Sequence, residues 1–285
     1  MKRIGIVAKT DREDARTVVP RLLQWCLARG FQPVVEKETA GLCPDAAVAT
    51  ARKPDLPGQV DLLLVLGGDG TLLSVARLVG DLGIPILGVN LGGLGFLTAL
   101  TVEELFPALE AYLNRELVIE ERMMLGAAVF RQGERLSEYV ALNDVVITKS
   151  AMSRIIRLEV AVDGHFATGY RADGLIISTP TGSTAYCLSA GGPIVFPTMD
   201  AVVLTPICSH TLTNRPIVLP ATQQIEVTLL TDQDVMLTLD GQVGFALKQS
   251  DTVLVFRATS RIRLLRFPQK HFFSVLRTKL KWGER

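Results

Sequence analysis

Two glycine-rich turns of different composition carry the residues that could do chemistry. The first, Gly67-Gly68-Asp69-Gly70-Thr71, places one carboxylate among glycines directly after an apolar run. Glycines let backbone amides approach a ligand closely, and the start of a helix favours anionic groups such as phosphate. A carboxylate there is a poor phosphate ligand, but it can accept a proton from a hydroxyl that attacks phosphorus. The alternative is that Asp69 only caps a helix that begins at Thr71.

The second turn is rich in hydroxyls and contains no charge. It follows Asp173-Gly174 and runs Ser178-Thr179-Pro180-Thr181-Gly182-Ser183-Thr184-Ala185-Tyr186. Its hydroxyls and amides could hold a phosphate or a ribose, and the Tyr186 ring could stack on a base. An ordinary Ser/Thr-rich β-turn is the alternative. Together the two turns indicate a site that activates a hydroxyl and binds a polyphosphate, as a small-molecule kinase requires.

Other polar positions are weaker candidates. A glycine loop at 90–96 could form a neighbouring wall of the first site or could be a plain turn. Asn143 and Asp144 precede an apolar strand and could bracket an adenine edge and ribose hydroxyls, although strand ends are often polar. Arg154 and Arg171 could contact phosphate through the guanidinium fork, although most arginines are solvated.

The elements that would position these residues change character near residue 100. Strands are expected at 4–7, 31–35, 61–66 and 84–89, with helices from Thr10 or Asp11 to Gly30 and at 71–79. This alternation predicts a doubly wound α/β domain over residues 1–100. A helix at 102–113 leads into short strands at 125–130, 138–148, 155–162, 225–230, 235–239 and 252–257, which predict a β-sandwich domain over 101–264. A last helix, 270–282, is expected to return within 265–285 and complete the first domain.

Composition narrows the class of protein. Of 285 residues, 48% are hydrophobic and 21% charged, with a formal net charge of +1, so a buried core is expected and a nucleic-acid footprint is not. Four dispersed cysteines favour reduced thiols, and three isolated histidines show neither metal spacing nor a catalytic triad. No signal peptide or membrane span is visible, so a soluble cytoplasmic protein is expected. A solvated face is expected for five basic residues near the end, Arg257, Arg261, Arg263, Arg266 and Lys270.

The chain resembles the NAD kinases along nearly its whole length. The matching segments are 67–71, 90–98, 143–144, 168–186, 206–210, 215–218 and 240–242. The block 172–186 is highly specific, whereas the Gly-Gly-Asp-Gly turn also occurs in diacylglycerol-type lipid kinases and phosphofructokinases. The resemblance implies an α/β domain followed by a β-sandwich, and ATP-dependent phosphorylation of the 2′-hydroxyl of the adenosine ribose of NAD, giving NADP.

The resemblance also implies roles for particular residues. Asp69 would be the general base and Gly70 an NAD contact, and the NAD pocket would contain Asn143, Asp144, Arg154, Arg171, Asp173, Thr184, Ala185, Tyr186, Cys187, Leu188, Ser189 and Gln242. The family often has Asn-Glu where this chain has Asn143-Asp144, so a shorter carboxylate would reach the ribose. No metal ligand is assigned to the protein, because the Mg²⁺ would arrive on the ATP phosphates.

The resemblance further implies homodimers or homotetramers, with the small molecules NAD and ATP as partners and neither nucleic acid nor membrane. Two alternatives remain open from the residues. A lipid kinase of the diacylglycerol or sphingosine type would share the first turn but would lack the 172–186 block. A non-catalytic NAD(P) sensor would keep the pocket without activity. The choice between ATP and polyphosphate, and between NAD and NADH, stays open.

Overall fold

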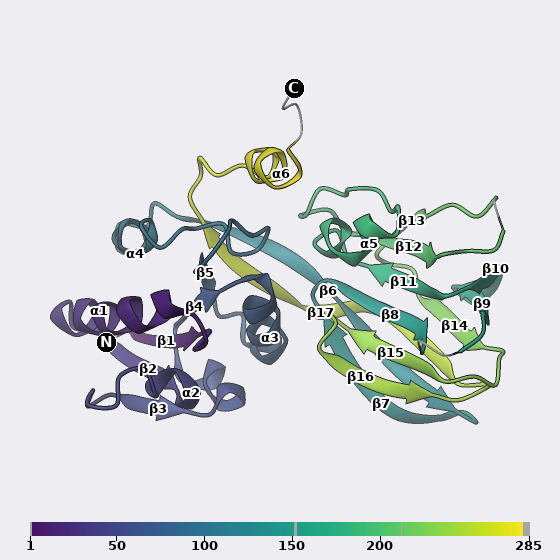
Figure 1. The fold of residues 1–285 in the computed structure, drawn as a ribbon, viewed down its shortest axis with the longest axis horizontal. Coiled ribbons are helices and arrows are strands. Elements are labelled where there is room, and N and C mark those ends of the chain that lie inside the picture. The colour runs from purple at the N-terminus through teal and green to yellow at the C-terminus, as the bar shows by residue number, and fades with distance from the viewer. Residues whose placement is uncertain (1, 151–152, 212, 282–285) are drawn as a thin grey trace. The chain divides into compact units, whose positions relative to one another are not determined.

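The structure, a computed structural model, describes residues 2–150, 153–211 and 213–281. The chain forms two compact units (Figure 1). The first comprises Met1–Glu121 and Ile262–Arg285, and the second comprises Arg122–Arg261. The helix that follows residue 100 lies in the first compact unit. Compact units are not necessarily domains, so the domain boundaries expected at residues 100 and 264 stay predictions.

The first unit is built on a parallel sheet. Its strands are β1 (Arg3–Ala8), β2 (Gln32–Glu36), β3 (Ala49–Ala51), β4 (Leu62–Gly67) and β5 (Ile86–Asn90), in the spatial order β5-β4-β1-β2-β3. Every residue of β4 is buried, as expected for a strand covered on both faces. The end of β17 (Thr252–Arg266) extends the sheet, with Leu264 parallel to Ile86 of β5.

Three helices connect strands of this sheet: α1 (Glu13–Ala28), α2 (Lys37–Ala40) and α3 (Asp69–Val79). Two more follow strands β5 and β17, namely α4 (Leu105–Leu113) and α6 (Phe272–Leu280), and short 3₁₀ turns lie at Lys53–Asp55, Pro57–Gln59 and Gly80–Leu82. The buried face of α1 is the predicted one, Ala15, Val18, Val19, Leu22, Leu23 and Cys26. The predicted cap is wrong: Arg12 precedes the helix and no side chain caps it. The predicted end of the last helix at Trp282 lies outside the described residues.

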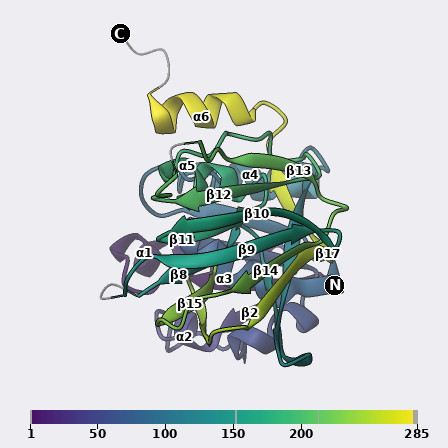
Figure 2. The same cartoon turned by 90° about the vertical axis from the view of Figure 1, so that its right-hand side faces the viewer.

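The second unit contains two antiparallel layers (Figure 2). One sheet has the order β13 (Ile217–Pro220), β12 (Ala201–Ile207), β11 (Gly174–Ser178), β8 (Asp144–Lys149), β15 (Val235–Leu239) and β16 (Val243–Leu247). The other joins β10 (His165–Ala172), β9 (Ile156–Val162), β14 (Ile225–Leu229) and β17, with β6 (Val118–Arg131) beside β17 and β7 (Glu134–Ala141) beside β6. A 3₁₀ turn (Gly182–Thr184) and α5 (Tyr186–Ser189) follow β11.

Alternation along the strands explains this core. In β11, Leu175 and Ile177 join the large apolar cluster to which both sheets contribute. Ile176, which points to the opposite face, packs in a separate cluster with Cys187 and Val203. Strand β11 and its neighbour β12 are therefore buried on both faces, and this allows them to be almost continuously apolar.

The expected fold class is confirmed: an α/β unit, an antiparallel β unit, and a C-terminal helix that belongs to the first unit. Two details of the strand prediction are wrong. The single strand expected at 138–148 is two strands, β7 and β8, which belong to different sheets. Two of the strands expected to be short, β6 and β17, have 14 and 15 residues. In the described ranges, no helix is both long enough and apolar enough to span a bilayer.

Candidate functional site

Asp69 lies at the junction between a parallel strand and the helix that follows it. Strand β4 ends at Gly67, Gly68 is extended with φ −109° and ψ −175°, and α3 begins at Asp69 itself, two residues earlier than expected. Gly68, which has no side chain, occupies the N-cap position of α3, and the Asp69 carboxylate bonds to residues 96–98. The alternative that Asp69 serves only as a cap is therefore wrong, and its carboxylate is used elsewhere.

The Asp69 carboxylate is bound by the loop that follows β5. Oδ1 accepts hydrogen bonds from the amides of Leu97 (3.0 Å) and Thr98 (2.9 Å) and from the Thr98 hydroxyl (2.9 Å). Oδ2 accepts one, from the amide of Phe96 (2.9 Å). Because an ionised carboxylate offers about four lone-pair sites over its two oxygens, Oδ1 is saturated and Oδ2 retains capacity for another donor.

The glycine loop at 90–96 is braced around this carboxylate. Asn90 donates from Nδ2 to the Thr98 hydroxyl (2.7 Å) and accepts the amide of Gly92 at Oδ1 (2.8 Å). A Cβ on Gly95 would overlap the Asp69 carboxylate and the Thr98 hydroxyl oxygen, so only glycine permits this approach. The loop therefore contacts Asp69 directly and is more than a plain turn.

A basic segment expected at the surface supports the same loop. Arg266 is only 5% exposed, and its Nη2 donates to the Phe96 carbonyl oxygen (2.8 Å). Lys270 donates to the Ala99 carbonyl oxygen (2.7 Å) and pairs with Glu104 (2.5 Å). The expectation of a solvated face is therefore wrong for Arg266 and Lys270, because both must satisfy carbonyls of the 90–99 loop.

The other three basic residues of that set lie nearer solvent. Arg257 and Arg261 pair with Asp200 at 3.3 Å and 2.7 Å, and Arg263 pairs with Glu121 at 3.2 Å. These partly exposed pairs hold the arginines on the surface and contribute little to stability.

In the second unit, a tight turn places Asp240 beside the start of β8. Asp240 and Gly241 both have left-handed backbones, with φ of 52° and 64°, and the Gln242 amide closes the turn on the Leu239 carbonyl (3.0 Å). Asp-Gly is the favoured pair for such a hairpin turn. The turn joins β15 to β16 and directs the Asp240 carboxylate inward, where it is 8% exposed.

The Asp240 carboxylate organises the Asn143-Asp144 pair. Oδ1 accepts the amides of Asn143 (2.7 Å) and Asp144 (3.2 Å), and Oδ2 accepts the amide of Leu142 (3.1 Å). These bonds hold the break between β7 and β8, so the chain leaves one sheet and enters the other at this point. In the sequence motif 240–242, Asp240 is therefore the residue that holds the Asn143-Asp144 backbone, although it was not among the predicted site residues.

Asp144 is buried, with 4% of its surface exposed. Burial, and then the neighbouring Asp240 carboxylate, raise the pKa of Asp144 to about 7. Burial also raises the pKa of the Cys187 thiol, which lies 3.3 Å from the Thr205 hydroxyl. The Asn143 side-chain Oδ1 is buried without a hydrogen-bond partner in the part of the chain that the structure describes. Such an acceptor is available to a ligand N–H or O–H.

The hydroxyls of the second turn mostly bond to their own loop. Their donors reach backbone carbonyls: Ser178 to Asn143 (3.2 Å) and Thr179 (2.9 Å), Thr179 to Leu142 (2.6 Å), Ser183 to Pro180 (2.6 Å), and Thr184 to Thr181 (3.2 Å). A Cβ on Gly182 would overlap the Asn143 carbonyl, so the turn packs directly on the Asn143 backbone. Two of these hydroxyls also accept backbone amides, Thr179 from Gly182 (3.1 Å) and Ser183 from Val195 (3.0 Å), so these buried side chains build the loop rather than face a ligand.

The remaining predicted residues lie at two ends of β11. Near Asp144, α5 presents Tyr186 to solvent (45% exposed) and buries Cys187, with Thr184, Ala185, Leu188 and Ser189 around them and Gln242 exposed on the turn. At the opposite end, Asp173 faces Lys149 at 3.6 Å, and Arg154 and Arg171 are exposed. Since a strand rises about 3.3 Å per residue, the two groups are separated by roughly 16 Å. Asp69 and Gly70 belong to the first unit.

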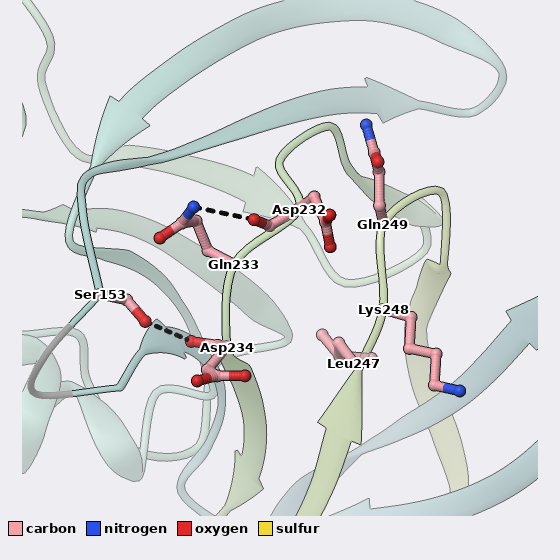
Figure 3. Close-up of a pocket in the computed structure, with 7 residues that line it drawn as sticks. All are labelled: Ser153, Asp232, Gln233, Asp234, Leu247, Lys248 and Gln249. Atoms are coloured by element: carbon pink, nitrogen blue, oxygen red, sulfur yellow. Dashed lines mark hydrogen bonds between the residues drawn. The ribbon is translucent and has the colours of Figure 1, made fainter.

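A polar hollow of about 640 Å³ lies next to Arg154 (Figure 3). It is lined by Ser153, Asp232, Gln233, Asp234, Leu247, Lys248 and Gln249. Gln233 donates to the Asp232 carbonyl (2.8 Å), and Ser153 donates to the Asp234 carbonyl (3.3 Å). The Arg154 amide donates to the Gln233 side chain (3.3 Å), which fixes the backbone of that arginine at the edge of the hollow.

Among the described residues, no three His, Cys, Asp or Glu side chains gather to hold an ion. The side chains present could still supply one or two ligands to a Mg²⁺ that keeps water and phosphate oxygens, which is the usual mode for that ion.

The first unit is doubly wound and holds an anchored carboxylate directly after a strand, and the second is an antiparallel β unit with a polar loop. These features are typical of a phosphotransferase. The family model described as ATP-NAD kinase N-terminal domain matches residues 4–117, and that described as ATP-NAD kinase C-terminal domain matches residues 142–267. The chain belongs to the NAD kinase family.

Full-length relatives agree. The chain is 53% identical to an NAD kinase of Geotalea daltonii over 286 residues and 52% identical to one of Geobacter sulfurreducens over 293 residues, with both chains covered completely in each case. A crystal structure of yeast NADH kinase complexed with NADH superimposes with a TM-score of 0.92 at 26% identity, covering all of this chain and 89% of the other. An Archaeoglobus fulgidus NAD kinase in complex with ATP gives a TM-score of 0.80 at 22% identity over 98% of each chain, which shows the shared fold.

Proposed function

We propose that the protein is an NAD kinase that transfers the γ-phosphate of ATP to the 2′-hydroxyl of the adenosine ribose of NAD, giving NADP and ADP. The family and the relatives at about half identity support the activity. The observation that carries the chemistry is the Asp69 carboxylate, which four donors hold while Oδ2 keeps room for one more.

In this reaction Asp69 acts as the general base. Oδ2 accepts the proton of the 2′-hydroxyl as the ribose oxygen forms its bond to the γ-phosphorus. The bond between that phosphorus and the bridging oxygen breaks, and ADP leaves with the electron pair. Catalysis of phosphoryl transfer depends mainly on the positioning of the reacting groups, because the loose transition state requires little covalent catalysis by the protein. The four hydrogen bonds on Asp69 supply that positioning for the base.

The second unit supplies the proposed NAD contacts. The unpartnered Asn143 Oδ1 is an acceptor for the adenine amino group, and Asp144 beside it is suited to a ribose hydroxyl. The exposed Tyr186 ring offers a stacking surface, and the guanidinium groups of Arg154 and Arg171 are suited to the pyrophosphate. Further contacts are proposed for Gly70, Asp173, Thr184, Ala185, Cys187, Leu188, Ser189 and Gln242.

Mg²⁺ would be delivered with ATP and would neutralise negative charge on the phosphates, and no residue of the protein is assigned to hold it. We propose a cytoplasmic homodimer or homotetramer that functions in NADP biosynthesis. The comparisons support neither a lipid kinase nor a non-catalytic sensor, since the relatives carry the name NAD kinase.

The decisive experiment is incubation with NAD, ATP and Mg²⁺, with NADP measured by an NADP-specific dehydrogenase. Parallel reactions with inorganic polyphosphate, and with NADH, identify the donor and the preferred acceptor. NADP formation with ATP supports the proposal. Calorimetric binding of NAD, with no NADP formed over hours, would instead identify a sensor.

A further inference from the structure

Arg266 is a buried cation at the last position of β17. Its Nη2 donates to the Phe96 carbonyl oxygen at 2.8 Å. Its Nε has no hydrogen-bond partner in the described structure and lies 3.8 Å from the Glu120 carboxylate. Burial lowers the pKa of the guanidinium, while the charges of Glu120 and Asp69 act in the opposite direction. A buried charge is costly unless compensated, and Asp69 is one of the two compensating acids.

The connection between Arg266 and Asp69 runs through one peptide group. The Phe96 carbonyl that accepts from Arg266 and the Leu97 amide that donates to Asp69 Oδ1 are the two ends of the same planar unit. A cation at the carbonyl oxygen polarises the peptide and strengthens its N–H as a donor. Guanidinium, peptide and carboxylate therefore form one continuous chain of hydrogen bonds.

We infer that Arg266 is a positioning residue for phosphoryl transfer: through the Phe96–Leu97 peptide it holds the Asp69 carboxylate so that Oδ2 stays open to the substrate hydroxyl. This inference rests on the proposed function of Asp69. Arg266 itself needs no contact with NAD or ATP. Its loss frees the 96–98 segment to rotate, and the carboxylate then points away from the attacking oxygen for part of the time.

The first test separates positioning from simple packing. Arg266→Met keeps much of the side-chain volume and removes the charge and the hydrogen bond to Phe96. We expect kcat to fall about tenfold to hundredfold, the usual cost of losing a residue that orients a reacting group, while the KM and Kd for NAD stay within about twofold. Arg266→Lys keeps a cation that can donate to Phe96 and should recover most of the loss. Arg263→Met, at an exposed arginine of the same strand, should match the parent protein.

A double-mutant cycle decides whether Arg266 acts through Asp69. In the Asp69→Asn background, adding Arg266→Met should change kcat by less than about twofold, because residues that act as a unit are not additive. If the two losses multiply, the inference is overturned and the proposed function stands. If Asp69→Asn alone keeps parental turnover, the proposed role of Asp69 fails, which is a distinct result.

Folding is checked by thermal unfolding and by calorimetric NAD binding for every variant. If Arg266→Met does not fold, the turnover of Arg266→Lys is compared with that of Arg266→Gln, because these two side chains differ in charge and are close in size. A fast Lys variant with a slow Gln variant supports the inference. Equal turnover in the two overturns it.

Discussion

At the scale of single residues, the Asp69 carboxylate is held on one side by donors from a single loop. Three backbone amides and one hydroxyl hold it, and all come from residues 96–98. The two oxygens are unequal, because Oδ1 takes three of the four bonds. An acid that served only as a helix cap would occupy the N-cap position, but that residue is Gly68.

Asp69→Asn should therefore lose turnover and keep substrate binding. The amide nitrogen of asparagine cannot accept a proton or the Phe96 N–H, so kcat should fall by roughly 10²-fold or more. Steady-state kinetics with calorimetric NAD binding measure both quantities. Asp81→Asn, at an exposed acid after α3, is the matched control. Near-parental turnover of Asp69→Asn would remove this residue from the chemistry.

Gly95 should be irreplaceable for a steric reason. In Gly95→Ala the new methyl group overlaps the Asp69 carboxylate and the Thr98 hydroxyl, and the unfolding free energy should fall by about 1–3 kcal/mol. At Gly93 a Cβ meets nothing within 4 Å, so Gly93→Ala should change that free energy by less than about 0.5 kcal/mol. Chemical denaturation compares the two variants. Equal stabilities would contradict the observed packing.

At the scale of elements, a short loop does the positioning in each unit. In the first unit, loop 90–99 reaches back to the end of β4, and in the second, the β15–β16 turn holds the start of β8. The Ser/Thr-rich turn after β11 is itself held by the Ser178 and Thr179 hydroxyls to residues 142–143, which link β7 to β8. Hydroxyl content in such a turn thus reflects loop construction first and ligand binding second.

Thr179→Val tests this reading of the hydroxyl turn. The buried Thr179 hydroxyl donates to the Leu142 carbonyl (2.6 Å) and accepts the Gly182 amide (3.1 Å), so valine leaves two buried groups unpaired at the same volume. The cost should be about 1–3 kcal/mol of stability. Thr50→Val, at an exposed threonine of β3, should be close to neutral. Denaturant titration of both variants is the measurement, and a neutral Thr179→Val would show that the bonds do not hold the turn.

At the scale of the whole molecule, the buried acid Asp144 makes stability depend on pH. Its folded pKa is raised to about 7, so between about pH 4 and pH 7 the folded protein holds a proton that the unfolded chain has released. The unfolding free energy should therefore fall as pH rises through this window, by up to about 1.4 kcal/mol per pH unit, and level off above it.

Asp144→Asn should flatten that profile. Asparagine is neutral at every pH, so relative to the parent protein the variant gains stability between pH 5 and pH 8. Asp232→Asn, at an exposed acid of the same unit, should leave the profile unchanged. Thermal unfolding of the three proteins at both pH values measures the effect. A parental slope in Asp144→Asn would assign the titration to another group.

Local patterns in the sequence determined the class of fold and the leading acid. Hydrophobic periodicity over neighbouring residues predicts the strand–helix alternation and the buried face of α1. The glycines on either side of Asp69 likewise make this carboxylate visible in a short segment of sequence. The chain also determined the second turn and the Asn143-Asp144 pair, although their placement around a ligand is a prediction.

Only the tertiary structure decided what holds those residues in place. The Phe96 and Thr98 bonds to Asp69 span 27 to 29 positions, the Asp240 bonds to 142–144 span 96 to 98, and the Arg266 bond to Phe96 spans 170. No local pattern carries such pairings, because they depend on which loops the completed sheets bring together. For the same reason sequence patterns wrongly predicted Arg266 at the surface and β7 and β8 as one strand. Local residue types suggest a charge or a strand, but burial and sheet membership depend on residues far away in the sequence.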